Sequence, residues 1–90
     1  MISHTNSAFW KGYAKLPKEI KILAKKQYKL FAFDAYHSSL HFKRVHSTKP
    51  IYSARINRNY RAVGVLNNNI IIWFWVGSHN EYDKLIRTNA

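Results

Sequence analysis

The side chains best suited to chemistry lie in the stretch WFWVGSHNEYDKL, residues 73–85, where polar residues follow an aromatic run. Ser78 and Glu81 have the S-x-x-E spacing of a capping box, which satisfies backbone N–H groups at the start of a helix. We therefore expect a short helix directly after the aromatic run, with His79 in its first turn and Tyr82 on the same surface. An imidazole can transfer protons, and the free N–H groups of a helix start attract phosphate. This pattern indicates a candidate site for an anionic substrate.

The same residues also fit a purely structural role. His79 would then be an exposed turn residue, and Tyr82 would pack against Leu85. The choice between the two interpretations depends on which other side chains the fold brings to this helix start.

Two arginines improve the case for a site. If residues 57–59 form a hairpin loop, Ile56 pairs with Tyr60 and Arg55 faces Arg61 across two antiparallel strands. Like charges at facing positions repel each other, so such a pair suggests a site that binds an anion between two guanidinium groups. The alternative is that the arginines extend separately into solvent.

The lysines of the first half are also arranged with a period. Lys18, Lys21, Lys25 and Lys29 follow one another at helical spacing and would form a stripe on one helix face. Such a stripe can bind a polyanion, or it can simply be the solvated face of an amphipathic helix.

Other kinds of site have little support. His37 and His41 have the spacing of two metal ligands on a helix, but the chain has no cysteine and only four Asp plus Glu residues, so we expect no zinc site. No nucleophile elbow or glycine-rich phosphate loop occurs, and nothing in the sequence implies a cofactor.

Charge restricts the class of partner. Fifteen Lys plus Arg against four Asp plus Glu give a formal net charge of +11, an excess that repels itself and indicates an anionic partner. That partner could be a nucleic acid, an acidic protein or a membrane surface. A chain of 90 residues supports one core, so residues 1–90 are expected to form a single domain. No stretch approaches the ~20 apolar residues of a membrane span, and we expect a soluble, cytoplasmic protein.

The elements that position these side chains follow from the periodicity. Residues 5–16 and 17–33 have the helical period, with Pro17 at the junction where a new helix can start. Residues 51–56, 60–66 and 70–76 alternate or are continuously apolar, which is typical of strands, and HFKRV over residues 41–45 is a weaker strand candidate. The predicted fold class is α+β: an N-terminal helical hairpin packed on one face of a small, mostly antiparallel sheet of four to five strands, with a short C-terminal helix.

Alternation also predicts which side chains share a face of the sheet. In IYSARI, residues 51–56, Tyr52, Ala54 and Ile56 would face the helical hairpin. Ser53 and Arg55 would face the other way.

The order of these segments resembles a known family. A lysine-rich helical hairpin containing KLPKEI is followed by SLHFKRV, by YSARINRNYRAVGVL and by IIIWFWVGSHNEYDKLI. This order is similar to that of the RelE/ParE toxins of bacterial type II toxin–antitoxin systems, and the similarity extends over nearly the whole chain. It implies the fold described above with a further strand near residues 2–4, and an acidic antitoxin that neutralises the basic toxin.

The resemblance also implies an activity. Ribonucleolytic members of the family cut messenger RNA on the ribosome without a metal ion, so this chain would be a metal-independent mRNA endoribonuclease with the ribosome and mRNA as partners. By the same resemblance the catalytic residues would be Arg61, His79 and Tyr82. Six further basic side chains would bind RNA or phosphate: Arg55, Arg58, Lys43, Arg44, Lys21 and Lys25.

The chain also departs from the ribonucleolytic pattern. The resemblance implies lysines where this chain has Tyr52 and Ala54, and no glutamate stands as an obvious general base. The ParE branch uses the same fold to inhibit DNA gyrase without nuclease residues, so a gyrase inhibitor is one alternative. A nonenzymatic, basic RNA-binding module is another.

Overall fold

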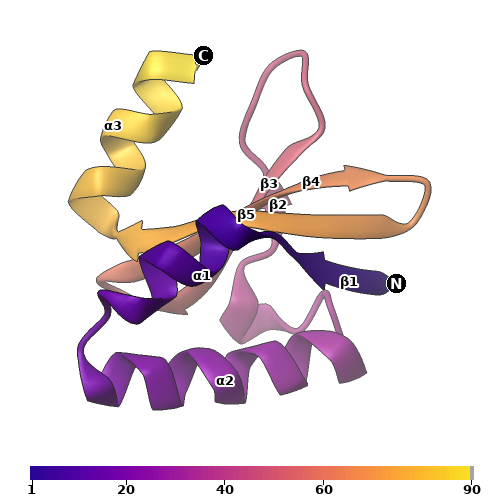
Figure 1. The fold of residues 1–90 in the computed structure, drawn as a ribbon. Helices are drawn as coiled ribbons and strands as arrows, with labels where there is room; N and C mark the ends of the chain where they lie inside the picture. Colours follow the sequence, from indigo (N-terminus) through magenta and orange to yellow (C-terminus); the bar gives the residue numbers. More distant parts are fainter. Residues whose placement is uncertain (90) are drawn as a thin grey trace.

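The computed structural model describes residues 1–89, which form a five-stranded sheet with helices on both faces. The helices are α1 (Ser7–Ala14), α2 (Lys18–Phe33) and α3 (His79–Asn89), with a short 3-10 turn η1 (Ser38–Leu40). The strands are β1 (Ile2–Thr5), β2 (Lys43–Arg44), β3 (Ile51–Asn57), β4 (Tyr60–Asn67) and β5 (Ile70–Ser78). In Figure 1, α1 and α2 lie on one side of the sheet and α3 lies on the other.

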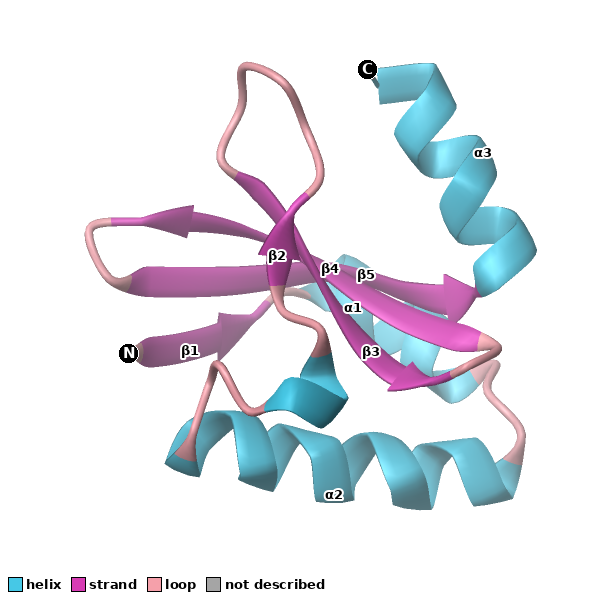
Figure 2. Cartoon of the chain, turned by 180° about the vertical axis from the view of Figure 1, so that it is seen from behind, coloured by secondary structure: helices cyan, strands magenta, loops and turns pink. Residues whose placement is uncertain are grey.

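The order of the strands in the sheet is β1-β5-β4-β3-β2. The pairs β5–β4, β4–β3 and β3–β2 are antiparallel, and β1 runs parallel to β5 at the edge. Figure 2 shows the two hairpins at opposite ends of β4, with β1 beside β5. The predicted α+β class, the helical hairpin and the short C-terminal helix are therefore confirmed.

The helices begin where their local sequence allows. The Asn6 side chain caps α1 by accepting a bond of 3.0 Å from the backbone N–H of Phe9. Pro17 is the N-terminal neighbour of α2, since its fixed backbone suits a helix start and not a helix interior. Two asparagines, Asn68 and Asn69, take positive φ angles of 50° and 63° in the β4–β5 turn, as the two-residue hairpin requires.

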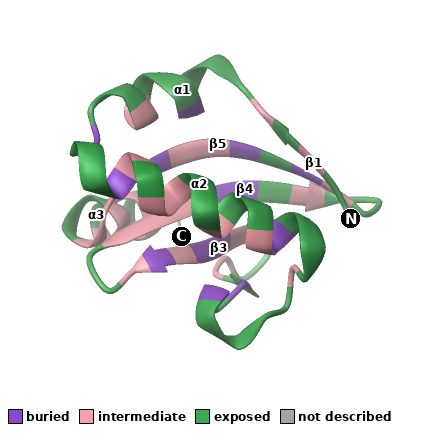
Figure 3. Cartoon of the chain, turned by 90° about the horizontal axis from the view of Figure 1, so that it is seen from below, coloured by how far each residue is buried: buried purple, intermediate pink, exposed green. Residues whose placement is uncertain are grey.

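The core lies between the sheet and the pair α1–α2. Phe31 of α2 makes edge contacts with Phe42 and Trp73, with ring centroids 5.0 and 5.2 Å away. Figure 3 shows buried positions spaced along α2 and gathered on the strands that face it. Ile20 of α2 belongs to the same core cluster, and Leu23 and Ala24 are partly buried against it, so one face of α2 packs on the sheet.

The opposite face of the sheet is not a simple polar surface. Ser53 and Val63, which pair across β3 and β4, both have no exposed surface, although the strand pattern predicts Ser53 on the polar side. Neither residue belongs to the core cluster that contains Ala54 and Ile56, so this second face of the sheet is also partly covered. Leu85 and Ile86 of α3 line a cavity of about 180 Å³ above Val63.

A close approach of α1 to β5 depends on a glycine. A Cβ atom added at Gly12 would lie 2.8 Å from the backbone oxygen of Val76 and 3.4 Å from its Cγ1. Backbone of an inner strand cannot rotate away as a flexible side chain can, so a methyl group here forces the helix off the sheet.

We therefore predict that Gly12→Ala lowers the free energy of unfolding by about 1 to 3 kcal/mol, the usual cost of an overpacked site. Helix propensity alone predicts the opposite sign, a gain of about 1 kcal/mol. Urea unfolding of the purified protein measures the difference. Ala8→Gly on the exposed side of α1 is the control for propensity, with an expected loss of about 1 kcal/mol. A stabilised Gly12→Ala protein would contradict the packing argument.

Candidate active site

The fold brings Arg61, His79 and Tyr82 together on the face of the sheet that carries α3. The Nε of Arg61 donates to Nδ1 of His79 at 3.4 Å, and the Arg61 Cζ lies 5.6 Å from the centroid of the Tyr82 ring. The rings of His79 and Tyr82 have centroids 5.8 Å apart. The sequence-predicted catalytic group is thus a real cluster, whose three members come from β4 and the first turn of α3.

The start of α3 is fixed by the predicted capping box. The Glu81 carboxylate accepts from both the backbone N–H and the hydroxyl of Ser78, at 3.3 and 3.0 Å, and the Ser78 oxygen accepts from the Glu81 N–H at 3.2 Å. These reciprocal bonds end β5 and start the helix at a defined residue. They place His79 in the first turn, as the spacing predicts.

A second bond ties the helix start to the β3–β4 hairpin. The backbone N–H of His79 donates to the carbonyl of Asn59 at 2.7 Å. This N–H is one that a helix leaves without an internal partner, so the hairpin tip acts as an additional cap. Through this bond the hairpin that carries Arg61 also positions the backbone of His79.

The facing arginines are confirmed, although the loop differs from the predicted one. Arg55 pairs with Arg61 in the antiparallel register, whereas Tyr60 pairs with Asn57 and not with Ile56. A register shift leaves Ile56 as an extra residue on β3, which lets it stay buried while Arg55 still faces Arg61.

The charge of this arginine pair is uncompensated. Both arginines are half-buried, and within residues 1–89 no carboxylate contacts either guanidinium group. The buried Nη1 of Arg61 has no hydrogen-bond partner among the residues that the structure describes. Unpaired guanidinium donors in a partly desolvated site favour the binding of an anion.

Aromatic packing supports the cluster from the side. Trp75 of β5 lies beside Tyr82, with ring centroids 6.4 Å apart. Gly77 leaves room for this arrangement, because a Cβ atom there would lie 2.8 Å from the Trp75 ring. The Tyr82 ring is therefore held between Trp75 and the Arg61 guanidinium.

The predicted phosphate-binding residues divide between several places. Arg58 is exposed in the hairpin turn, and Lys43, which pairs with Ser53, is exposed on the edge strand β2. Arg44 uses its Nε to bond the carbonyls of His46 and Lys49, both at 3.1 Å, and so closes the loop between β2 and β3.

Lys21 and Lys25 are not brought to this cluster. They lie on α2, on the side of the sheet away from α3 (Figure 1), and Lys21 lies 5.8 Å from the Tyr13 ring centroid. Contact of these lysines with RNA stays a prediction, and it would have to occur on a different surface from the contact with Arg61.

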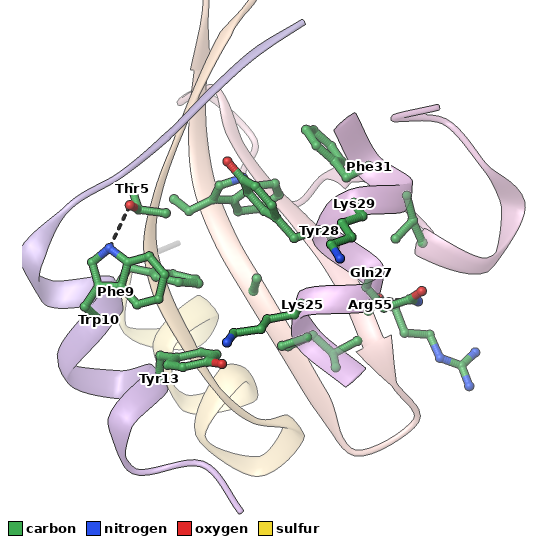
Figure 4. Close-up of a pocket in the computed structure, with 16 residues that line it drawn as sticks. Thr5, Phe9, Trp10, Tyr13, Lys25, Gln27, Tyr28, Lys29, Phe31 and Arg55 are labelled. Atoms are coloured by element: carbon green, nitrogen blue, oxygen red, sulfur yellow. Dashed lines mark hydrogen bonds between the residues drawn. The ribbon is translucent and has the colours of Figure 1, made fainter. Parts of the chain in front are cut away.

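A groove separates α1 from α2 on that second surface. Figure 4 shows Phe9, Trp10 and Tyr13 along one side of it and the residues of α2, including Lys25 and Lys29, along the other. Its volume is about 250 Å³, and its walls are mostly aromatic and aliphatic. Arg55 also lines this groove, but the guanidinium end of its side chain points away from it (Figure 4).

Sequence reasoning missed two contributors to the cluster. Oδ2 of Asp83 lies 3.5 Å from Nε2 of His79, at the i, i+4 spacing that places two side chains together on a helix. Because the capping box predicts a helix from residue 79, the i, i+4 spacing could have predicted the contact between His79 and Asp83. The carbonyl of Asn59 had no such signal, because its contact depends on how the hairpin folds back.

His37, one of the two histidines considered for zinc, caps a short helical turn. His37 precedes η1, and its Nδ1 accepts from the Ser39 backbone N–H at 3.2 Å. Among the residues described, no group of three His, Cys, Asp or Glu is placed to hold a metal ion.

No helix within residues 1–89 is long and apolar enough to cross a membrane.

The family follows from comparison with known proteins. A family model described as a ParE-like toxin domain matches residues 18–84, which is well over half of the chain. The chain therefore belongs to the ParE-like toxin domain family, as its resemblance to RelE/ParE toxins predicts. No curated protein matches the sequence.

Solved structures of toxins share the fold at low sequence identity. A chain of the RelB-RelE antitoxin-toxin complex from Methanococcus jannaschii is 20% identical with a TM-score of 0.67, over 91% of this chain and 96% of that chain. A chain of the archaeal RelE-RelB complex from Pyrococcus horikoshii is 15% identical with a TM-score of 0.67, over 86% and 92%. The YoeB/ParE toxin from Agrobacterium tumefaciens is 10% identical with a TM-score of 0.68, over 88% and 99%.

The strand positions where the resemblance implies lysines do not face the cluster. Ala54 is buried in the core, and Tyr52 stacks on Phe42 at a centroid distance of 5.0 Å, on the α1–α2 side. Arg55 is the basic residue of β3 on the side of Arg61. Lysines at positions 52 and 54 would therefore enter the core and not the site.

The capping box generates a prediction about the helix that carries His79. Ser78→Ala removes the oxygen that accepts from Glu81, and loss of such a cap costs about 1 kcal/mol of stability. We expect this loss in urea unfolding, together with faster amide hydrogen exchange in the first turn of α3. Ser47→Ala, an exposed serine in the β2–β3 loop, is the matched control and should change neither quantity. Equal stability of the two variants would show that the cap does not hold the helix start.

Proposed function

We propose that this protein is the toxin of a type II toxin–antitoxin pair and that it cleaves messenger RNA on the ribosome, without a metal ion, at the cluster of Arg61, His79 and Tyr82. The observation that carries the proposal is the half-buried Arg61 guanidinium, which contacts an imidazole and a phenol and faces a second arginine. Among residues 1–89 it has no carboxylate partner. Family membership supports the toxin part of the proposal.

The chemistry requires three functions at one phosphodiester. The 2′-hydroxyl must lose a proton as its oxygen attacks phosphorus, the five-coordinate phosphate must be stabilised, and the departing 5′-oxygen must gain a proton. Arg61 is the group for the phosphate, since a guanidinium stays charged and can bond two oxygens at once. Arg55, opposite Arg61 in the register, adds positive charge to the same place.

His79 is the group for the first proton. It is the imidazole beside Arg61, so a phosphate bound to the guanidinium would bring the neighbouring 2′-hydroxyl within reach of the ring. Tyr82 would orient the nucleotide and donate the proton to the 5′-oxygen, regaining it later from water. The products are a cyclic 2′,3′-phosphate and a free 5′-hydroxyl.

The partner that silences the toxin would be an acidic antitoxin. A chain with a net charge of +11 attracts an acidic segment over its whole surface, and such a segment can fold as it binds. The groove between α1 and α2 offers an apolar floor with Lys25 and Lys29 on its α2 side. We assign it to an amphipathic, acidic segment of the antitoxin, whose apolar residues would cover Trp10 and Tyr28, both of them exposed.

A second candidate function is inhibition of DNA gyrase. The matching family is named for ParE-like toxins, and the resemblance assigns gyrase inhibition to that branch. On this alternative Arg61, His79 and Tyr82 would hold α3 on the sheet and would take no part in chemistry. Intact messages in growth-arrested cells would favour it.

Growth of cells that express the chain alone tests the proposed cluster. We expect the wild type to arrest growth and to leave cut messages, and we expect His79→Ala and Arg61→Ala to lower cleavage about 100-fold or more, the usual size of an acid–base or charge-stabilising contribution. Primer extension on cellular messages measures the cuts.

Lys84→Ala is the control, because Lys84 is an exposed base on the same helix. It should leave both arrest and cleavage unchanged. If the His79→Ala and Tyr82→Ala proteins are folded and remain fully toxic, the assignment of this cluster is wrong.

Charge reversal on one wall of the groove tests the antitoxin site. Lys25→Glu combined with Lys29→Glu should weaken binding of the acidic antitoxin by about tenfold or more, with a smaller loss at high salt, because like charges would then face each other. Titration of the purified antitoxin by calorimetry measures the change. Lys26→Glu is the matched control, since Lys26 is exposed on α2 but does not line the groove. Equal weakening by the control would place the antitoxin elsewhere.

A further inference from the structure

We propose that Asp83 is a positioning residue that holds His79 in one tautomer, and that Arg61 masks the proton-accepting nitrogen of His79 until a phosphate draws the guanidinium away. This inference rests on the proposed ribonuclease function for its consequence in catalysis. The contacts from Arg61 to His79 and from His79 to Asp83 can be tested without measuring activity.

The tautomer follows from which atoms can only donate. Nε of an arginine carries a hydrogen and never accepts, so the 3.4 Å contact requires Nδ1 of His79 to be the acceptor. In the neutral ring the proton must then be on Nε2. Nε2 lies 3.5 Å from the Asp83 carboxylate, which can only accept.

Within residues 1–89 the His79 ring has no competing hydrogen-bond partner. The charged and titratable groups that face His79 are Arg61 from β4 and Tyr82 and Asp83 from α3, and the Asn59 carbonyl from the hairpin bonds only its backbone N–H. Both ring contacts are long for hydrogen bonds, so each holds the ring weakly. The two together select one tautomer, and loss of either should relax it.

The same geometry blocks the base. While the Arg61 Nε–H points at Nδ1, that nitrogen cannot accept a proton from a 2′-hydroxyl. A bound phosphate would favour movement of the guanidinium, because a phosphate offers several acceptor oxygens. The buried Nη1 of Arg61 has no hydrogen-bond partner within residues 1–89. When Arg61 turns to the phosphate, Nδ1 becomes free next to the bound phosphodiester. Cleavage then forms the 2′-O–P bond, breaks the P–O5′ bond and moves the 2′-hydroxyl proton to Nδ1, with the Asp83 carboxylate beside the resulting imidazolium. The leaving 5′-oxygen takes its proton from the Tyr82 hydroxyl.

Nitrogen-15 NMR of the imidazole rings tests the resting state. At about pH 8, where an ordinary imidazole is neutral, the His79 ring of the wild type should show a protonated Nε2 and an unprotonated Nδ1. Exposed His4 provides the comparison and should show the usual mixture of tautomers. A protonated Nδ1 in His79, or a mixture like that of His4, would overturn the proposal.

Variants separate positioning from simple stability. Asp83→Ala should shift His79 towards a mixture of tautomers. It should lower kcat about tenfold and leave KM within twofold of the wild type. Asp83→Asn keeps an acceptor oxygen and should retain the tautomer. Asp34→Ala removes an exposed carboxylate far from the ring and should change nothing. If Asp83→Ala keeps both the tautomer and kcat, Asp83 does not position His79.

A substrate analogue tests the masking. A dinucleotide with hydrogen in place of the 2′-hydroxyl cannot be cleaved, and its binding should move the Nδ1 resonance of His79 much more than the Nε2 resonance. Arg61→Ala should show the moved resonance without any ligand. An Nδ1 resonance that stays unchanged in both experiments would overturn the masking. If the chain cleaves no RNA at all, the proposed function fails while the ring resonances still decide whether Asp83 and Arg61 hold His79 in this way.

Discussion

The register of β3 against β4 is the constraint on which the candidate site depends. Because Arg55 pairs with Arg61, both guanidinium groups point to the face of the sheet away from the core, and Ala54 and Ala62 point into it. The same hairpin ends at Asn59, whose carbonyl bonds the backbone N–H of His79. A shift of the pairing by one residue would send the arginines into the core and remove the contact with α3.

The two faces of the sheet then serve different purposes. The α1–α2 face holds the aromatic core and, at its rim, an apolar groove with lysines beside it. The opposite face holds the polar cluster of Arg61, His79 and Tyr82. Helix α3 covers only part of the strands on that face. On the proposed function the antitoxin binds one face and RNA the other, so Lys25 and Arg61 would contact different partners.

The sequence predicts those parts of the site that local chemistry determines. The capping box Ser78–Glu81 acts over three residues, and the arginine pair needs only a short hairpin, so both could be found without coordinates. The full burial of Ser53 could not be predicted, because alternation assigns a residue to one face of a strand and does not say whether that face is covered. The separation of Lys21 from Arg61 was equally hidden, since it depends on the face of the sheet that α2 covers. Periodicity describes the faces of an element, and only the tertiary fold says which faces meet.

On the proposed function, Arg61 binds the phosphate of an RNA while it is cleaved. The most direct measurement is primer extension on a message after purified protein has been added to a reconstituted translation reaction. We expect discrete cuts in the translated message for the wild type and none above background for folded Arg61→Ala. Intact messages and continuing translation with the wild type, together with loss of DNA supercoiling by gyrase in a parallel assay, would contradict it.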